Sequence, residues 1–497
     1  MKKLLIFTLF LFAGTVSCNL IGGQKNQEAN SETITEEKNY VLDGILDSKE
    51  LKVVVDYNST NYFVYKGQPM GFQYELLNEF AKYMGVDLKI FVSNNLEETF
   101  TGLNTSKYDL VAKNLTVTTA RNKVVDFTEP LALTRQVLVQ RAPDSNNRSN
   151  GNDLPETELI REQLDLAGKT VHVQKNTAFV QRLVHLSEEI GEPINIVKDT
   201  IFGVEQLIAL VAEGKIDYTV CDENVGLVNQ KYFPWIDVST PVSFNQKLSW
   251  AVQKGNENWL AYINEWIVDF KETVTYRVIY NRYFTGNRNS VIVRSDYHSI
   301  NGGKISEYDD IIREVAMMHN WDWRLIASLI MQESNFDPYA ESWMGAVGLM
   351  QLMPQTASQH DVEDYFDPRD NIRGGIEQLN WLRNIFQSII EDEEERMKFI
   401  LASYNCGIGH VMDARKLAMK YGKDPSVWKD NVDIFILKKS IPQFYNDPVV
   451  RWGYCRGEEP FNYVIKILDR YRQYVNVLPD ENNIALLSLP VLQSSLK

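Results

Sequence analysis

One glutamate in the second half of the sequence has a position that suits acid catalysis. Glu333 is the last residue of a predicted helix from Trp323 to Glu333. Together with the apolar residues Ile326, Leu329 and Ile330, it stands at the three- and four-residue spacing of one helix face. The carboxyl group therefore shares the apolar face of that helix. Burial disfavours the carboxylate, and so does the negative end of the helix dipole. A carboxyl group kept protonated near neutral pH can donate a proton to a glycosidic oxygen. The alternative is a glutamate that leaves the helix into solvent.

Two segments downstream of Glu333 contain groups that suit a polymer-binding groove. The segment from Gly345 to Ala357 contains two glycines three residues apart, Gly345 and Gly348. Glycines allow a polymer to lie close to the main chain. The segment from Ala402 to His410 places an aromatic ring and an amide before a glycine-rich turn.

These three segments resemble the lysozyme-like catalytic domain of the soluble lytic transglycosylases. The resemblance covers about residues 308–477, with the three family motifs in order and at the family's spacing. It implies that Glu333 is the catalytic acid and base, and it implies no cofactor and no metal. Ser403 replaces the family's alanine, Cys406 has no assigned role, and the stretch from Gly453 to Glu458 resembles one membrane-bound subgroup. The resemblance also implies a set of substrate-binding residues: Ser342, Gln351, Met353, Tyr404 and Asn405.

The implied reaction is cleavage of the β-1,4 bond between N-acetylmuramic acid and N-acetylglucosamine in peptidoglycan glycan strands, by a lyase of the lytic exotransglycosylase type. Glu333 would protonate the leaving oxygen and then remove the proton of the C6 hydroxyl, which closes a 1,6-anhydro ring. This reaction needs one catalytic carboxylate, whereas most glycosidases use a pair of carboxylates. A second catalytic carboxylate among Asp337, Glu341 and Asp413 would indicate a hydrolytic muramidase, although surface or capping roles suit these residues better. A non-catalytic lipoprotein receptor for muropeptides is the other alternative.

The first half of the chain has the rhythm of an α/β protein. Short β-rich runs at 51–55, 88–92 and 170–173 alternate with amphipathic helices at 72–84 and 178–190. This alternation favours an α/β domain with mainly parallel sheets. From Tyr308 onward the pattern is almost wholly helical. The predicted fold is therefore multidomain: a two-lobed α/β domain like those of periplasmic binding proteins, followed by a mainly α, lysozyme-like domain.

Polar residues in this α/β region resemble those of the family 3 periplasmic solute-binding proteins. The resemblance rests on the segments from Asn114 to Arg121 and from Val125 to Pro130. It implies that Arg121 clamps a carboxylate, a contact that suits a planar guanidinium. It also implies that Asp222 pairs with an ammonium group. The remaining residues implied to bind the ligand are Asn114, Thr116 and Thr177, the last at a helix N-terminus, where anions bind well.

This set of residues predicts an amino-acid or muropeptide ligand that regulates the helical domain. Alternatives remain for two of these residues. Arg121 could be an exposed residue paired with Asp126 or Glu129, and Asp222 could be a strand-end cap. The two lobes could also be an empty scaffold.

The N-terminus predicts export. Lys2 and Lys3 precede an apolar run, which reads as a signal peptide over residues 1–17 and is too short to cross a bilayer. The residues that end at Cys18 resemble a bacterial lipobox, which implies a lipidated cysteine and a membrane lipid anchor on the periplasmic face of the outer membrane. The alternative is an ordinary signal peptide. Residues 18–45 form the lipidated N-terminus and a flexible tether.

Length and composition limit the number of domains and the classes of function. A chain of 497 residues predicts two to four domains. We place them at 46–285 and 304–479, with a linker at 286–303 and a tail at 480–497; a polar loop is expected at 142–155. The net charge of −15 argues against nucleic-acid binding. Six scattered histidines and no CxxC motif argue against a metal centre with histidine or thiolate ligands. Besides Cys18, the cysteines are Cys221, Cys406 and Cys455; the last two could pair, or all three could be small buried residues.

Overall fold

The computed structural model describes residues 40–142, 159–200, 202–285, 295, 297, 299 and 303–478. The predicted signal peptide, Cys18, the C-terminal tail and most of the predicted linker and polar loop lie outside these residues. Within the predicted tether, the residues from Tyr40 onward belong instead to helix α1 (Tyr40–Ser48). Its apolar residue Ile45 is buried. Among the described residues, no helix combines the length and apolarity needed to cross a bilayer.

Lobe 1 of the α/β region is built on a mixed sheet in the order β4-β1-β5-β13-β6, with β7 also paired to β13. Strands β1, β4 and β5 are parallel, whereas β13 runs antiparallel to its neighbours. A separate hairpin joins β2 and β3. The strands are β1 (Glu50–Val55), β2 (Phe63–Tyr65), β3 (Gln68–Met70), β4 (Asp87–Val92), β5 (Leu110–Thr116), β6 (Val125–Phe127), β7 (Ala132–Thr134) and β13 (Gln246–Gln253), and the helices are α2 (Phe72–Met84), α3 (Leu96–Asn104), α7 (Glu257–Lys271) and α8 (Val274–Tyr280).

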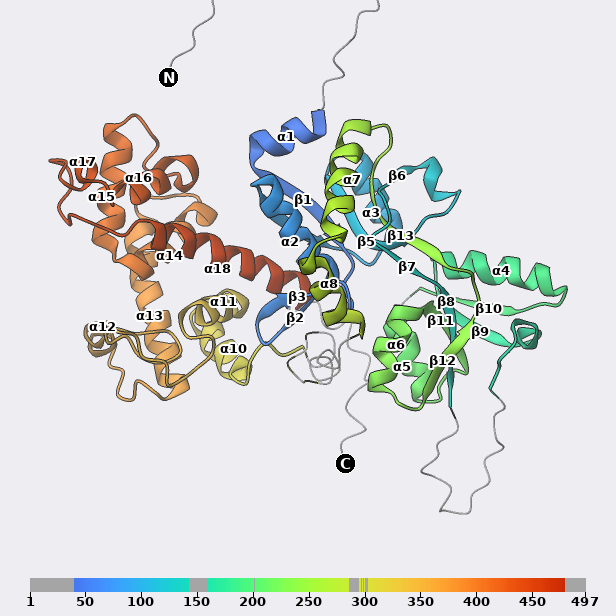
Figure 1. Ribbon diagram of the computed structural model, residues 1–497. Coiled ribbons are helices and arrows are strands. Elements are labelled where there is room, and N and C mark those ends of the chain that lie inside the picture. Colours follow the sequence, from blue (N-terminus) through green and yellow to red (C-terminus); the bar gives the residue numbers. More distant parts are fainter. Residues whose placement is uncertain are drawn as a thin grey trace, which may run out of the picture. The chain divides into compact units, whose positions relative to one another are not determined.

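Lobe 2 is a second mixed sheet in the order β10-β9-β11-β8-β12. Strands β9, β10 and β11 are parallel, and β8 is antiparallel to both of its neighbours. Helices α5 and α6 lie against this sheet (Figure 1). The elements are β8 (Gln136–Arg141), β9 (Thr170–Gln174), α4 (Ala178–Ile190), β10 (Asn195–Asp199), α5 (Val204–Ala212), β11 (Tyr218–Asp222), α6 (Glu223–Tyr232) and β12 (Ile236–Pro241).

The sheets differ from the expectation of mainly parallel pairing. Each sheet has only two parallel pairings, β1–β4 and β1–β5 in lobe 1 and β9–β10 and β9–β11 in lobe 2, and the other pairings, all made by β13 or β8, are antiparallel. The chain passes from lobe 1 to lobe 2 between β7 and β8, and it returns between β12 and β13. Strands β8 and β13 therefore enter their sheets directly from the other lobe, without the crossover helix that makes neighbouring strands parallel.

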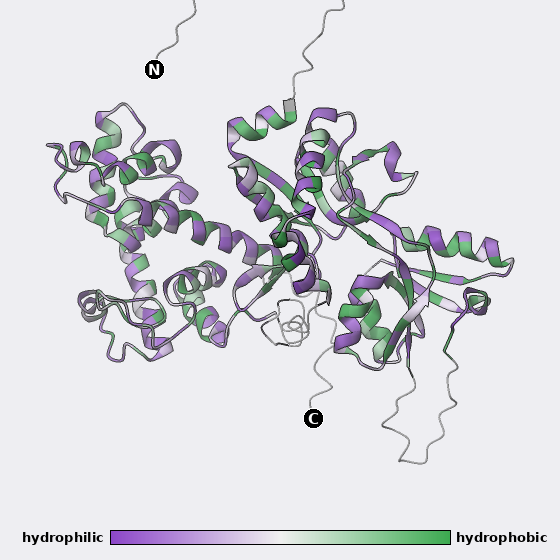
Figure 2. Cartoon of the chain, viewed as in Figure 1, coloured by the Kyte–Doolittle hydropathy of each residue, from purple (hydrophilic) through white to green (hydrophobic). Residues whose placement is uncertain are grey.

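The region after residue 303 is helical, as predicted. Helix α11 lies at its centre, and its residues from Arg324 to Met331 are all buried. Helices elsewhere alternate hydrophobic and hydrophilic residues along their length (Figure 2), which is typical of helices with one buried face. The helices are α10 (Asp309–Met318), α11 (Trp323–Glu333), α12 (Pro354–Gln359), α13 (Pro368–Gln387), α14 (Glu393–Cys406), α15 (Ile408–Lys420), α16 (Asp433–Lys438), α17 (Pro442–Tyr445) and α18 (Glu458–Val477).

Helix α18 connects the helical region to lobe 1. It packs against α11 and α14, and it also contacts β2, β3 and β4. The Tyr474 hydroxyl donates a hydrogen bond to the carbonyl of Gly67 (2.8 Å), and the Asn476 amide donates one to the carbonyl of Ile90 (3.1 Å). Buried apolar residues of lobe 1 and of the helical region form one continuous core.

Candidate active site and ligand cleft

Glu333 lies at the C-terminal end of α11, where the sequence places it. The helix begins at the N-cap Asp322, whose side chain accepts a hydrogen bond from the backbone N–H of Arg324. Burial raises the pKa of the Glu333 carboxyl group from 4.5 to about 7. The carboxyl group is therefore close to half protonated at neutral pH, which suits a group that donates and then recovers a proton.

Two residues of α18 that were not predicted from the sequence control this carboxyl group. The Tyr463 hydroxyl donates a hydrogen bond to Glu333 Oε1, which opposes the effect of burial on the pKa. Glu459, one turn earlier on the same helix, raises the pKa further through charge repulsion. Glu459 is exposed and Tyr463 is buried. The only sign of this effect in the sequence is the helical spacing of a carboxylate and a tyrosine before an apolar run. That sign is weak.

The loop between α11 and α12 is fixed beside Glu333 by three side chains. The hydroxyl of Ser334 donates to the carbonyl of Leu349 (2.8 Å), and that of Tyr404 donates to the carbonyl of Met350 (2.8 Å). The Asn371 carbonyl accepts a hydrogen bond from the Met350 backbone N–H (2.8 Å). Each of these side chains comes from a different helix or helix end, so the loop conformation depends on how the helices pack.

Some of the predicted groove residues support the loop, and others are partly exposed. Ser342 Oγ accepts from the Ala346 backbone N–H (2.9 Å), and the Gln351 amide donates to the carbonyls of Ala340 and Gly348 (both 2.9 Å). Both side chains thus support the loop itself. Met353 is 40% exposed at the N-terminus of α12. Tyr404 and Asn405 are half-buried at the end of α14, and burial raises the pKa of the Tyr404 hydroxyl group well above its ordinary value, with a further contribution from Glu333.

Backbone strain is concentrated around the same loop. Asn335, Phe336 and Gln351 all have positive φ angles, between 48° and 61°. Such conformations cost roughly 1–3 kcal/mol each and are common at functional sites. Gly348 also has a positive φ, and an added Cβ would come within 2.2 Å of the Asn371 amide. At Gly348 the close approach is therefore one of the protein's own groups, whereas the space beside Gly345 is open.

The three alternative carboxylates do not surround Glu333. The Asp337 side chain accepts a hydrogen bond from the Tyr339 backbone N–H (2.9 Å), which is the expected capping role. Glu341 is exposed. The expectation of a surface position is wrong for Asp413, which is fully buried, pairs with the equally buried Lys439 (3.0 Å) and accepts hydrogen bonds from the backbone N–H groups of Arg451 and Trp452. The only carboxylate that affects the pKa of Glu333 among the described residues is Glu459.

A second group of charged residues lies where the two α/β lobes meet. The Arg121 guanidinium donates to the carbonyl of Thr116 (2.9 Å). Burial raises the pKa of Asp222 to about 7, an effect that the charge of Arg121 opposes. The alternative pairing of Arg121 with Asp126 is not observed, because Asp126 pairs with Lys254. Asp222 Oδ1 is buried and has no hydrogen-bond partner among the described residues, although Asp222 does stand at the N-cap of α6.

The other predicted ligand residues occupy both lobes. The Asn114 amide donates to Asn61 Oδ1 and accepts from Gln73, both at 2.7 Å, so it belongs to a network within lobe 1. Thr177 is the N-cap of α4, but its hydroxyl donates to a strand carbonyl and does not cap the helix amides. A lobe-to-lobe contact was not predicted: Glu205 of α5 accepts a hydrogen bond from the backbone N–H of Ser59 (3.1 Å) and another from its hydroxyl.

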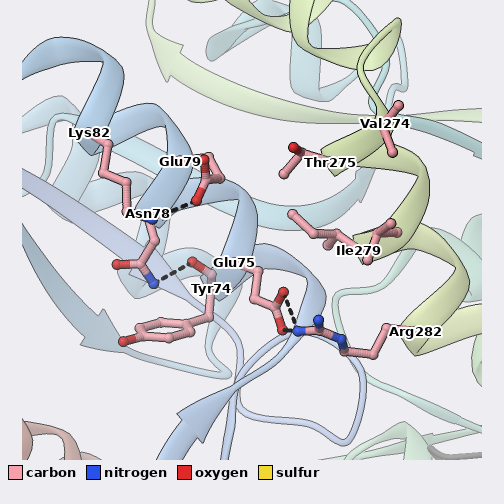
Figure 3. Close-up of a pocket in the computed structure, with 10 residues that line it drawn as sticks. Tyr74, Glu75, Asn78, Glu79, Lys82, Val274, Thr275, Ile279 and Arg282 are labelled. Atoms are coloured by element: carbon pink, nitrogen blue, oxygen red, sulfur yellow. Dashed lines mark hydrogen bonds and ion pairs between the residues drawn. The ribbon is translucent and has the colours of Figure 1, made fainter.

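A cavity of about 510 Å³ lies away from both groups of residues, between α2 and α8 (Figure 3). Its wall contains the ion pair between Glu75 and Arg282 (2.6 Å). None of its lining residues was predicted to be functional. Within the described part of the chain, no cluster of three or more His, Cys, Asp or Glu side chains is arranged to hold a metal ion.

Comparison with known families agrees with this division of the chain. Residues 51–286 match the model of "Bacterial extracellular solute-binding proteins, family 3", and residues 310–427 match that of "Transglycosylase SLT domain". Among solved structures, a mutant of the arginine-binding protein ArgBP from T. maritima is 26% identical with a TM-score of 0.41, covering 50% of this chain and 100% of its own.

Full-length relatives share both regions. A protein of Desulfosudis oleivorans is 36% identical over 85% of this chain and 89% of its own length, and one of Pseudomonas fluorescens is 32% identical over 89% and 87%. Both are named membrane-bound lytic murein transglycosylase F. A two-lobed α/β domain followed by a lysozyme-like domain with Glu333 at its centre defines a modular lytic transglycosylase. The chain belongs to the membrane-bound lytic murein transglycosylase F family.

Proposed function

We propose that this protein cleaves the β-1,4 bond between N-acetylmuramic acid and N-acetylglucosamine in peptidoglycan without water. Glu333 protonates the bridging oxygen, and the resulting carboxylate removes the proton of the C6 hydroxyl, whose oxygen bonds to C1 and closes a 1,6-anhydro ring. The observation that carries the proposal is the half-buried Glu333, with a pKa of about 7, held by Tyr463. A group with this pKa can act as an acid and then as a base in one cycle.

The experiment that tests this proposal is digestion of purified sacculi by the wild-type protein and by Glu333→Gln. Glutamine keeps the size of the side chain but cannot protonate the leaving group. Mass analysis of the products identifies the chemistry, because an anhydro end is one water lighter than a hydrolytic end. Retained turnover in Glu333→Gln would refute the assigned role, and absence of any product from the wild-type protein would favour the non-catalytic receptor.

Hydrolysis is the second candidate, and one observation favours it. Glu459 is close enough to raise the pKa of Glu333, as expected for a second carboxylate at a glycosidase site. In that case Glu459 would hold the attacking water, and the product would carry a reducing end. Glu459→Gln would then abolish turnover, whereas a lyase that uses Glu333 alone would retain it.

The α/β domain is proposed to bind a zwitterionic ligand, either an amino acid or a muropeptide, between its two lobes. Arg121 supplies a cation for the ligand carboxylate, and Asp222 supplies a partner for its ammonium group. The unpartnered Oδ1 of Asp222 supports this role, because a buried polar atom without a partner is costly. Calorimetry with candidate amino acids and muropeptides tests it, with Arg121→Lys and Asp222→Asn as the variants expected to lose binding.

We further propose that the bound ligand regulates Glu333 through α18. The same helix contacts Glu333 through Tyr463 and lobe 1 through Tyr474. Linkage requires that glycan binding alter ligand affinity by the same factor as the ligand alters glycan affinity. Tyr474→Phe removes one contact with lobe 1, and Tyr471→Phe, which removes a contact of α18 with Asp322 within the helical region, is the matched control. Equal ligand affinity with and without bound glycan in the wild type would refute the coupling.

The protein is proposed to be a membrane-associated periplasmic enzyme, anchored by a lipid on Cys18 at the outer membrane. The names of the relatives include "membrane-bound", and no described helix is suited to cross a bilayer. Cys18 lies outside the described residues, so this proposal rests on the sequence. Labelling with a fatty-acid analogue tests it: Cys18→Ser should lose the label and leave the membrane fraction.

A further inference from the structure

A second cavity lies where helix α18 meets lobe 1. It has a volume of about 240 Å³, and its walls come from α2, β3 and β4 on one side and from α18 on the other. Hydrogen bonds from Tyr474 and Asn476 to the carbonyls of Gly67 and Ile90 hold the two sides together. Neither Glu333 nor any residue predicted to bind the regulatory ligand lines this cavity, so it is a separate feature of the protein.

The wall that α18 contributes carries a surplus of positive charge. Its residues lie three, four and seven positions apart and therefore share one face of the helix: Lys466, Asp469, Arg470 and Gln473. Asp469 forms an ion pair with Arg472 (2.8 Å), which balances its charge. Among the described residues, Lys466 and Arg470 have no ion-pair partner. The wall on the side of lobe 1 contains no charged residue.

The guanidinium of Arg470 uses only one of its nitrogens for contacts within the protein. Nη1 donates hydrogen bonds to the carbonyl of Ser328 (3.2 Å) and to Gln332 Oε1 (3.5 Å). Within the described part of the chain, Nε and Nη2 have no hydrogen-bond partner. Two neighbouring N–H groups on one edge of a planar guanidinium can bind two oxygens of a carboxylate or a phosphate side by side.

Partial burial makes this unpaired guanidinium costly. Burial lowers the pKa of Arg470 below its ordinary value, and the groups that oppose this effect are Tyr474 and Tyr74 rather than a carboxylate. A charge that is removed from water without an opposite charge beside it destabilises the fold. An anion bound in the cavity would supply that opposite charge.

We propose that this cavity binds a small oxyanion, either a carboxylate or a phosphate group. Two oxygens of the ligand accept hydrogen bonds from Nε and Nη2 of Arg470, and the ammonium group of Lys466 supplies a second positive charge. The volume of the cavity suits a small ligand, because drug-sized ligands occupy about 300–1,000 Å³.

Arg470 also connects the proposed site to the helix that carries Glu333. Ser328 and Gln332 both belong to α11, and Gln332 directly precedes Glu333. The side chain that holds the anion therefore also holds the end of the catalytic helix. A ligand that binds only the folded protein stabilises it as the ligand concentration exceeds the Kd, so the anion should stabilise the contact between lobe 1 and the helical region.

The test is a titration of the Tm of the full chain with sodium acetate and with sodium phosphate, each compared with sodium chloride at the same pH and ionic strength. No glycan is present, so the result does not depend on the role proposed for Glu333. We expect acetate, phosphate or both to raise the Tm on the order of 1 °C or more for each tenfold increase in concentration above the Kd. A larger rise with acetate assigns a carboxylate ligand, and a larger rise with phosphate assigns a phosphate ligand.

Arg470→Gln should lose this rise in Tm. Lys466 is exposed, so Lys466→Gln tests the same site without disturbing a buried group, and it should reduce the rise. Arg369→Gln is the matched control, because it removes the same charge from a surface ion pair with Glu314 (2.6 Å) outside the cavity; it should keep the full rise. An equal rise with chloride, or a rise that persists unchanged in both cavity variants, would overturn the proposal.

Discussion

Replacing Tyr463 with phenylalanine should raise the pKa of Glu333. The pKa of about 7 corresponds to about 3 kcal/mol of disfavoured ionisation relative to the ordinary value of 4.5. The Tyr463 hydroxyl opposes this cost, because it donates a hydrogen bond to the carboxylate. A hydrogen bond to a charged group contributes roughly 1.5–3 kcal/mol, so its loss should raise the pKa by about one to two pH units.

The assay is the pH dependence of kcat/KM on solubilised glycan strands. A general acid must be protonated, so kcat/KM falls as the pH rises through the pKa of the free enzyme. We expect this falling limb to move to higher pH in Tyr463→Phe. Tyr404→Phe is the matched control, because that hydroxyl is also close to Glu333 but donates to the carbonyl of Met350. A limb that stays in place in Tyr463→Phe, or that moves equally in both variants, would refute the reasoning.

Three further predictions concern charge and stability. Folding raises the pKa of Glu333, so its contribution to stability is lost as the pH rises from 4.5 to about 7. In urea unfolding, the free energy of unfolding of Glu333→Gln relative to that of the wild type should therefore increase by about 3 kcal/mol across this pH range. Affinity for a zwitterionic ligand should increase as the pH rises through 7, where Asp222 ionises, and calorimetry should show no such increase in Asp222→Asn. Asp413→Asn should cost about 3–5 kcal/mol in the same unfolding assay, because it leaves the buried Lys439 unpaired, and a cost below about 1 kcal/mol would contradict this.

Local sequence patterns predicted the helices that position the main candidate residues. The predicted bounds of α2, α4 and α11 match the structure because apolar periodicity and end residues are properties of short stretches of chain. The partial burial of Glu333 was predicted for the same reason. Arg121 and Asp222 were predicted through family motifs; the charge of Arg121 acts on the pKa of Asp222, and their role in binding a ligand stays a prediction.

Contacts between distant segments could not be predicted in this way. Tyr463 and Asn371 act on Glu333 and on its loop from other helices, and no local pattern marks them. Asp413 was expected at the surface because charged residues are rarely fully buried, and its partner Lys439 lies in another helix end. The antiparallel strands β8 and β13 were missed because their direction depends on where the chain crosses between the lobes.

The continuous core formed by lobe 1 and the helical region limits how the two regions can be exchanged during evolution. The side chains of Tyr474 and Val477 on α18 are buried, and a chain cut near residue 303 would expose apolar surface on both fragments. Such surface favours aggregation over folding. Recombination that exchanges one sensor for another must therefore carry a compatible C-terminal helix with it, so the two halves are expected to evolve as a matched pair.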